Sequence, residues 1–322
     1  MCVSMALLTG CIFKIPVNLH GFIDREGNWL QEPFFHSAIP FSEGLYAVRA
    51  GEEAYGKWGF VDRNGEQAIG FNYDAAGFFS FGMAPVMVRT EDRQEWFFID
   101  REENKLFGKY FLSAYPFSEG YAAVQSADDE TYGKWGFIDV FGNYAIEPQF
   151  LGAGSFSEGL AMYVEGVGIA GICGYIDQQG EIVIPARYSY GGLFSEGLAA
   201  VKLTANMDNP DWGYIDMKGE VVIDFQYTYA RAFSEGLAPV MTGATISGTW
   251  GYIDQDGETV LESIYYDALS FSEGLAAVNR TRSDIDGWGY IDTKGMTVID
   301  GNYSSASDFK DGTAPVSIVE RR

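Results

Sequence analysis

The sequence predicts an all-β fold in which tandem repeats of a short antiparallel β-meander stack into a propeller-like ring. Three observations predict it. An aspartate recurs every 38 or 39 residues along almost the whole chain. An aromatic residue stands two positions before each of these aspartates. Apolar residues within each unit alternate with a period of two and show no helical period, which is the pattern of β-strands.

The recurring aspartate divides the chain into eight units. Each unit also has an aromatic residue eleven positions after the aspartate, a phenylalanine seventeen after it and a glycine twenty after it. A tryptophan precedes the aspartate by four positions in six units, and His20 and Cys173 fill that position in the other two. The aspartates are Asp24, Asp62, Asp100, Asp139, Asp177, Asp216, Asp254 and Asp292, and the tryptophans are Trp58, Trp96, Trp135, Trp212, Trp250 and Trp288.

Each unit is expected to contain three or four short strands. The segment Trp-Gly-Tyr-Ile-Asp alternates, so its tryptophan and tyrosine point to one side of a sheet and its glycine and isoleucine to the other. Asp-x-x-Gly then predicts a turn, because aspartate bonds the backbone ahead of it and glycine tolerates positive φ. A second strand such as 221–223, a Ser-Glu-Gly turn and a Leu-Ala-Ala-Val strand follow. One such sheet cannot bury two apolar faces alone, so the copies must stack.

The two ends of the array predict how it closes. The first unit begins on a strand of the Trp-Gly type, residues 20–24, and the last unit ends on a strand of the Leu-Ala-Ala-Val type, residues 313–316. Elsewhere these two strand types form the hairpin between units, so pairing of the last strand with the first would close a ring. The alternative is an open β superhelix (a solenoid), in which residues 12–17 supply a local partner for the first unit.

The motifs resemble the WG-repeat family, named for its Trp-Gly pair. The resemblance covers roughly residues 20–317 and rests on many positions at once. It implies a single domain of eight repeats over residues 12–322. Because WG repeats occur in many bacterial proteins of unassigned role, it implies little about function.

Residues 1–11 are interpreted separately. The tetrapeptide 8–11, Leu-Thr-Gly-Cys, resembles a bacterial lipobox, so Cys11 is a lipidation candidate. This predicts a protein of the bacterial cell envelope, or a secreted one. Only ten residues precede Cys11 and none is Lys or Arg, so the charged start of a signal is missing and a cytoplasmic location is the alternative.

The composition excludes several kinds of partner. A net charge of -24 repels phosphate, so nucleic acid is not expected, and contact with a membrane is expected only through a lipid anchor at Cys11. Three cysteines without CxxC spacing predict neither a disulfide framework nor a zinc site. No metal and no cofactor are predicted.

The in-frame polar residues are interpreted first as structural. The eightfold aspartate, including Asp139, Asp216 and Asp254, is expected to be a turn residue, because its spacing lacks the alternating oxygen ligands of a calcium loop. The tryptophans are expected to pack between units, with stacking on a sugar or a choline-type group as the alternative. The acids of the Ser-Glu-Gly turns are expected to be solvated, with an acidic mouth as the alternative. These acids are Glu43, Glu119, Glu158, Glu196, Glu235, Glu273 and Asp311.

Function is expected in the segments that escape the repeat. The hairpin loops 50–57, 90–95, 126–134, 165–172, 204–211, 242–249 and 280–287 differ from one another, and repetition places them all on one edge. Several are acidic, which makes Glu52, Glu53, Asp128, Asp129, Glu130, Asp208, Asp284 and Asp286 candidates for binding a partner.

These observations predict a non-catalytic binding or scaffolding protein, whose partner is a protein or a glycan held by the loops. One alternative is a carbohydrate- or choline-type binding module that uses exposed aromatic residues. A weaker alternative is a hydrolase on a propeller scaffold. Catalysis has little support, since the chain has two histidines, His20 and His36, and no nucleophile elbow, phosphate-binding loop or HExxH motif.

Overall fold

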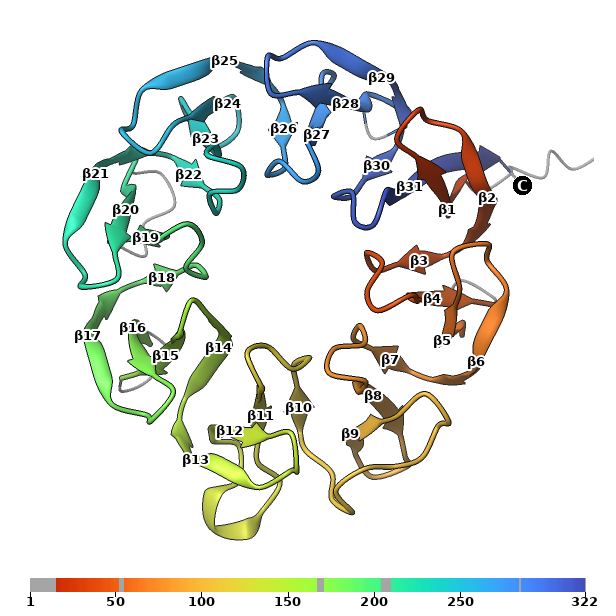
Figure 1. Cartoon of the computed structure of the whole chain (residues 1–322), viewed down its shortest axis with the longest axis vertical. Coiled ribbons are helices and arrows are strands. Elements are labelled where there is room, and N and C mark those ends of the chain that lie inside the picture. The colour runs from red at the N-terminus through yellow and green to blue at the C-terminus, as the bar shows by residue number, and fades with distance from the viewer. Residues whose placement is uncertain (1–15, 52–54, 167–170, 204–209, 284, 322) are drawn as a thin grey trace, which may run out of the picture.

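Eight small antiparallel sheets form a closed ring around a central opening (Figure 1). The computed structural model describes residues 16–51, 55–166, 171–203, 210–283 and 285–321. In each sheet the strands are ordered outward from the opening. The innermost strand has two residues in seven of the sheets, and a strand of seven residues runs along the rim in seven of them. This arrangement is an eight-bladed β-propeller, which confirms the predicted fold class.

The first four blades follow in chain order after residue 36. Blade 1 has β3 (Ser37–Ala38), β4 (Tyr46–Ala50), β5 (Lys57–Val61) and β6 (Gln67–Tyr73). Blade 2 has β7 (Ala75–Ala76), β8 (Ala84–Arg89) and β9 (Gln94–Ile99). Blade 3 has β10 (Ser113–Ala114), β11 (Tyr121–Gln125), β12 (Trp135–Asp139) and β13 (Tyr144–Phe150), with a short 3-10 helix η1 (Asp129–Thr131) in its loop. Blade 4 has β14 (Gly152–Ser157), β15 (Leu160–Glu165), β16 (Ile172–Asp177) and β17 (Ile182–Tyr188).

The next three blades repeat the same order. Blade 5 has β18 (Tyr190–Gly191), β19 (Leu198–Lys202), β20 (Trp212–Asp216) and β21 (Val221–Tyr227). Blade 6 has β22 (Tyr229–Ala230), β23 (Ala238–Thr242), β24 (Thr249–Ile253) and β25 (Thr259–Tyr265). Blade 7 has β26 (Asp267–Ala268), β27 (Leu275–Asn279), β28 (Trp288–Asp292) and β29 (Thr297–Tyr303).

Blade 8 is assembled from both ends of the chain and closes the ring. It contains β30 (Ser305–Ala306) and β31 (Thr313–Arg321) from the C-terminal end, and β1 (Pro16–Asp24) and β2 (Trp29–Phe35) from the N-terminal end. β1 and β31 pair over nine positions, from Pro16 with Arg321 to Asp24 with Thr313. The predicted pairing of the last strand with the first is therefore confirmed, and the open superhelix is wrong. Residues 16 and 17, expected in that alternative to support the first unit locally, pair with the C-terminal strand.

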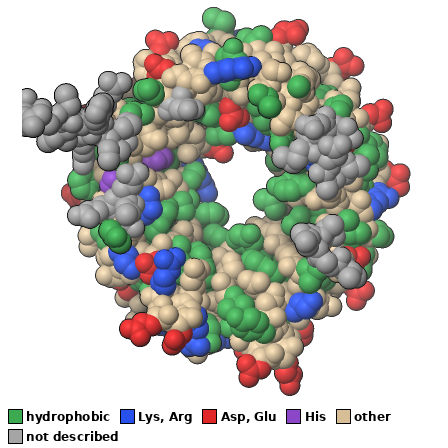
Figure 2. Space-filling view, turned by 180° about the vertical axis from the view of Figure 1, so that it is seen from behind, with side chains coloured by type: hydrophobic (Ala, Val, Ile, Leu, Met, Phe, Trp, Pro, Cys, Tyr) green, Lys and Arg blue, Asp and Glu red, His purple; other side chains and the backbone are tan. Residues whose placement is uncertain are grey.

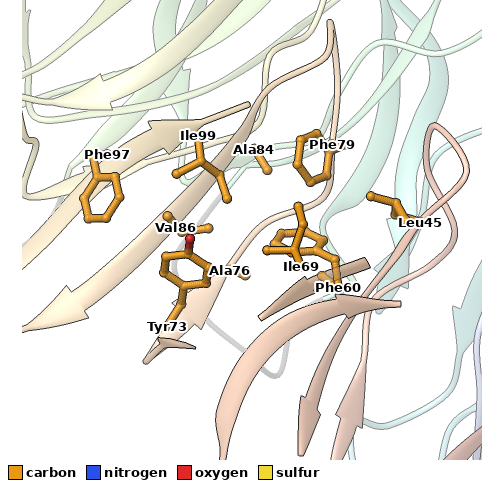
Figure 3. Close-up of a cluster of buried hydrophobic side chains, with 11 residues drawn as sticks. Leu45, Phe60, Ile69, Tyr73, Ala76, Phe79, Ala84, Val86, Phe97 and Ile99 are labelled. Atoms are coloured by element: carbon orange, nitrogen blue, oxygen red, sulfur yellow. The ribbon is translucent and has the colours of Figure 1, made fainter. Parts of the chain in front are cut away.

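The hydrophobic core is divided among the interfaces between neighbouring blades. In the cluster between blades 1 and 2, Phe60 of β5 packs with Ile99 of β9 and with Phe79, which precedes the turn into β8 (Figure 3). Along the third strand the aromatic residue packs toward the following blade and the isoleucine toward the preceding one, as with Tyr214 and Ile215 in blade 5. Both faces of each sheet are covered in this way, as the two-sided apolar pattern predicts.

Blade 2 departs from the pattern because its fourth strand is replaced by an irregular segment. Residues 101–112 form no regular ladder with β9. They meet it at the isolated bridges Ile99–Lys105 and Trp96–Phe111 and through the hydrogen bond that the Leu106 N–H donates to the Phe98 carbonyl. In blade 1 the fourth strand runs against Gly59, where an added Cβ would lie 2.9 Å from the Gly70 carbonyl oxygen. Blade 2 has Phe97 at this position instead of glycine, so a regular strand cannot approach as closely.

The alternating strand directions give the ring two different faces. The Ser-Glu-Gly turns between first and second strands and the Asp-x-x-Gly turns between third and fourth strands lie on one face, called here the turn face. The loops between second and third strands and the connections from each fourth strand to the next blade lie on the other, the loop face. The strand ends that flank the seven variable loops therefore all lie on the loop face. Figure 2 shows this face, with hydrophobic side chains gathered around the central opening.

Candidate binding groove

A groove of about 980 Å³ opens on the loop face between blades 5 and 6. It lies where β19 and β23 end and β20 and β24 begin, and the connections into β18, β22 and β26 form its other wall. This aromatic groove is lined by Ser189, Tyr190, Gly192, Leu193, Ala200, Lys202, Trp212, Tyr229, Ala230, Arg231, Ala232, Met241, Thr245, Trp250, Tyr266 and Asp267.

Four aromatic rings form a ladder along the groove. The ring centroids of Tyr190 and Trp212 are 5.0 Å apart, those of Trp212 and Tyr229 are 6.0 Å apart, and those of Tyr229 and Trp250 are 6.3 Å apart. The two tryptophans are 7% exposed and form the floor, whereas Tyr190 is 53% exposed and Tyr266 is 40% exposed at the edges. Such a surface offers a ligand rigid aromatic faces at little cost in conformational entropy.

The charged groups at the groove form two pairs. Lys202 Nζ lies 3.6 Å from Asp211 Oδ1, and both side chains are almost fully buried. An Arg231 guanidinium nitrogen lies 3.0 Å from Asp267 Oδ1, while the guanidinium carbon lies 4.5 Å from the centre of the Trp250 ring. The groove walls therefore carry compensated charge.

The tyrosines of the ladder share one repeat position, which lies between the predicted second strand and the Ser-Glu-Gly turn. Thirteen residues after the repeat aspartate, blades 5 and 6 have Tyr190 and Tyr229 at the start of the first strand. The other blades have a small or acidic residue there: Ser37, Ala75, Ser113, Gly152, Asp267 and Ser305. Two adjacent large residues at an otherwise small position are the signal that could have located the groove.

The repeat aspartates lie in the turns between third and fourth strands. In all eight, one carboxylate oxygen accepts hydrogen bonds from the backbone N–H groups two and four residues ahead; for Asp139 these come from Phe141 and Asn143, both at 2.9 Å. The same pair of hydrogen bonds is accepted by the other seven aspartates, Asp24, Asp62, Asp100, Asp177, Asp216, Asp254 and Asp292. This geometry is that of a turn residue.

The acids of the Ser-Glu-Gly turns ring the opening on the turn face, and most bind the neighbouring blade. Ser195 and Leu198 exchange backbone hydrogen bonds, and Glu196 and Gly197 between them have φ of 56° and 81°, as a type I′ hairpin requires. In six of the turns the carboxylate accepts the glycine N–H of the turn in the next blade. The donors and acceptors are Gly82 to Glu43, Gly159 to Glu119, Gly197 to Glu158, Gly236 to Glu196, Gly274 to Glu235 and Gly312 to Glu273.

The six repeat tryptophans lie at or near the start of the third strand of their blades, at the loop face. Trp212 and Trp250 are buried, and the side chains of Trp58, Trp96, Trp135 and Trp288 are partly buried against the interblade clusters. Because Trp212 and Trp250 also line the groove, these two contribute both to an interface and to the floor of the candidate site.

The acidic loop candidates are spread around the ring. Asp128, Asp129 and Glu130 are exposed in blade 3, and Asp286 is exposed in blade 7. None of these four lines the aromatic groove. Glu52, Glu53, Asp208 and Asp284 lie outside the described residues, as do Cys2 and Cys11.

The remaining chemistry-bearing residues are embedded in the blades. His20 is partly buried, and burial, then His36 and Arg49 nearby, lower its pKa to about 4. Cys173 is buried, which raises the pKa of its thiol to about 12. Within the described part of the chain, no three His, Cys, Asp or Glu side chains are grouped as metal ligands. The described residues also contain no helix long and apolar enough to cross a membrane.

The architecture and the groove together define the class of protein: an eight-bladed β-propeller closed by its two terminal strands, with an aromatic groove on its loop face. More particularly, the chain belongs to the WG containing repeat family. The family model matches residues 21–52, 58–89, 96–128, 135–166, 174–204, 212–244, 250–280 and 288–318. No curated protein matches the sequence.

Solved structures share the fold at low identity. A structure described as the eukaryotic initiation factor superimposes with a TM-score of 0.51 at 10% identity, over 89% of this chain and 96% of that chain. Prolyl oligopeptidase B from Galerina marginata gives 0.57 at 10% identity, over 89% and 55%. Oligopeptidase B from Trypanosoma brucei gives 0.57 at 10% identity, over 88% and 53%. The chain spans about half the length of these two peptidases, and the likeness concerns the fold alone.

Proposed function

We propose that this protein is a non-catalytic binding propeller whose ligand is a glycan seated in the aromatic groove. One observation carries the proposal: Tyr190 and Tyr229 replace small residues at the same repeat position in two adjacent blades and complete a ladder with Trp212 and Trp250. Packing alone does not require them, because the other six blades close without a tyrosine there.

The groove suits a sugar because it combines aromatic faces with polar edges. A pyranose ring has a flat face of C–H groups, which stacks on aromatic rings, and a rim of hydroxyls. Tyr190 and Tyr266 expose ring surface, and the side chains of Ser189 and Thr245 lie in the same lining. The indole N–H of Trp212 is buried with no acceptor among the described residues, so a donor stands unused in the wall. A volume of about 980 Å³ is at the upper end of typical small-ligand pockets.

A choline-type ligand fits the groove less well. An aromatic cage binds a quaternary ammonium through the negative faces of its rings. The Arg231 guanidinium already lies 4.5 Å from the centre of the Trp250 ring and would repel a second cation there. Lys202 adds another cation to the lining.

Catalysis is not proposed, because the groove offers no pair of acid and base. Asp267 is the single carboxylate among its described lining residues, and Arg231 binds it at 3.0 Å. Glycoside hydrolysis usually requires two carboxyl groups flanking the scissile bond.

A glycan array probed with the full chain and with Tyr190→Ala tests the proposal. Binding of at least one glycan by the native protein, reduced at least tenfold by Tyr190→Ala, is the expected result. Tyr115→Ala is the matched control, because Tyr115 is 44% exposed and stacks on Trp135 at 5.4 Å in blade 3, away from the groove. Absence of any glycan binding would refute the proposal, and binding that survives Tyr190→Ala would place the site elsewhere.

A protein partner on the same face is the second candidate. Several loops there expose an apolar side chain, notably Ile246 at 92%, Tyr55 at 81% and Tyr132 at 67%. Such residues, gathered on one face, favour an interaction surface. If a partner protein is recovered by pull-down, Tyr132→Ser with Ile246→Ser should release it, whereas Tyr190→Ala should not.

A further inference from the structure

The aromatic groove continues into a second, more polar pocket. This neighbouring pocket of about 380 Å³ lies between the loops of blades 6 and 7 and shares Met241, Thr245, Tyr266 and Asp267 with the groove. Its far wall comes from the end of β27 and the loop that follows. Because they share these residues, the two pockets form one path across blades 5, 6 and 7.

The neighbouring pocket contains a cation, Arg282, that differs from the two cations of the groove in its partners. Lys202 and Arg231 each have a carboxylate partner. Arg282 has no carboxylate within 4 Å among the described residues, and its guanidinium carbon lies 5.0 Å from the centre of the Tyr266 ring. The side chain of Arg282 is exposed. Its charge is therefore available to an anion, while the ring beneath it helps to hold the guanidinium in place.

We propose that the two pockets together bind an oligosaccharide that carries a carboxylate, with neutral rings on the aromatic ladder and the acidic sugar on Arg282. The inference rests on the glycan function proposed above and specifies its ligand class. Tyr266 connects the two parts because it borders both pockets, so a ring stacked beside it lies next to the guanidinium. A guanidinium offers a carboxylate two parallel N–H donors, a match that neutral hydroxyls do not provide.

The negative charge of the whole protein limits how many acidic sugars the glycan can carry. At a net charge of -24, a glycan with an acid on every residue would be repelled as it approached. One acidic sugar among neutral ones fits Arg282, the one cation of the two linings with no carboxylate partner among the described residues, and the compensated charges of the groove.

Binding should be measured by titration calorimetry with acidic oligosaccharides, with their neutral parents, which lack the acidic sugar, and with their methyl esters, which differ from the acids only at the carboxylate. Suitable pairs are lactose with 3′-sialyllactose, and xylotriose with xylotriose bearing one glucuronic acid; the methyl ester of each acidic sugar keeps its shape and removes its charge. At least one acidic probe should bind roughly tenfold or more tightly than its neutral partner and its ester, a difference of about 1.4 kcal/mol. Arg282→Gln should remove this preference without weakening the neutral probe.

The controls separate this inference from the proposed function. Arg280→Gln changes a cation in the same loop that lines neither pocket and should leave the preference intact. Equal affinity for acid, ester and neutral sugar, or a preference that survives Arg282→Gln, would overturn the inference while leaving the glycan function in place. Failure of every probe in the calorimeter overturns this ligand class, and failure of every glycan on the array overturns both proposals.

Discussion

The carboxylate of Glu158 accepts hydrogen bonds from the backbone N–H groups of Glu196 and Gly197 in the next blade, at 2.7 and 2.8 Å. Glu158 itself has φ of 54°, a conformation that costs a non-glycine residue energy. The bond from the glycine N–H recurs at five other turns and joins neighbouring blades around the opening. Arg25 and Arg63 add to it by donating to the backbone carbonyls of Glu273 and Asp311 in the preceding blades, each at 2.5 Å.

Glu158→Ala should lower the stability of the protein by about 1 kcal/mol, because two interblade hydrogen bonds to a charged group are lost while the strained backbone is kept. Differential scanning calorimetry would measure this as a lower melting temperature. Glu262→Ala removes an exposed glutamate from β25 whose side chain forms no hydrogen bond with the described residues, and it serves as control. Equal melting temperatures for both variants would show that the link contributes nothing.

Phe81→Glu should raise the melting temperature. Phe81 occupies the acid position of the blade 2 turn with φ of 55° and is 53% exposed. The N–H of Gly120 in the next turn has no acceptor among the described residues, and a glutamate at 81 would supply one, as Glu43 does for Gly82. The gain should be about 0.5–1 kcal/mol. Phe81→Ala, which removes the ring without supplying an acceptor, should not give the gain.

Ile23→Ala should destabilise the protein as strongly as Ile138→Ala, by about 2–5 kcal/mol. Both residues are fully buried at the same repeat position, but Ile23 lies in the closing blade and Ile138 in blade 3. Urea denaturation followed by tryptophan fluorescence would compare them. A nearly neutral Ile23→Ala would mean that the ring is not closed in solution.

Asp100→Ala should lower the melting temperature at about pH 7 and lose this effect in acid. The side-chain amide of Asn104, followed by backbone N–H groups, lowers the pKa of Asp100 below 3.8. A carboxylate with a lowered folded-state pKa stabilises the protein above its unfolded pKa, and this stabilisation is lost as the pH falls through the folded value. The two melting curves should therefore converge below about pH 4. A constant difference across this range would contradict the hydrogen-bonded role.

Cys173 should be unreactive in the native protein. Burial raises the pKa of its thiol to about 12, so almost no thiolate exists near neutral pH. In a Cys2→Ser, Cys11→Ser background, a chromogenic disulfide reagent should label one thiol only after denaturant is added. Rapid labelling of the folded variant would show that blade 4 opens readily.

Much of the fold follows from the spacing of a few residues. The eightfold aspartate, the alternation of Trp-Gly-Tyr-Ile-Asp and the strand types at the two ends predict the blades and their closure. The missing fourth strand of blade 2 does not follow from spacing. Its cause is Phe97, and the effect depends on how closely the neighbouring strand approaches that position, which a linear pattern does not contain.

The candidate site was harder to predict. The sequence places the variable loops on one face, and the groove opens on that face. The acidic loop residues do not locate the groove, because Asp128 and Asp286 belong to blades on different parts of the ring and neither lines it. Tyr190 and Tyr229 lie 39 residues apart and resemble the many core aromatics, so their convergence is visible only once adjacent blades are packed together.

The shared blade 8 has a consequence for how the protein is made. β1 ends at Asp24 and its partner β31 begins at Thr313, so β1 is synthesised long before the strand that it pairs with. At synthesis rates of about 5–20 residues per second, β1 waits roughly 15–60 s with an unpaired edge. Unpaired strand edges invite pairing with other chains. The seven internal blades can form in order as the chain emerges, but the ring itself can be completed only after β31 has emerged, which makes nascent chains and stalled fragments the form most exposed to aggregation.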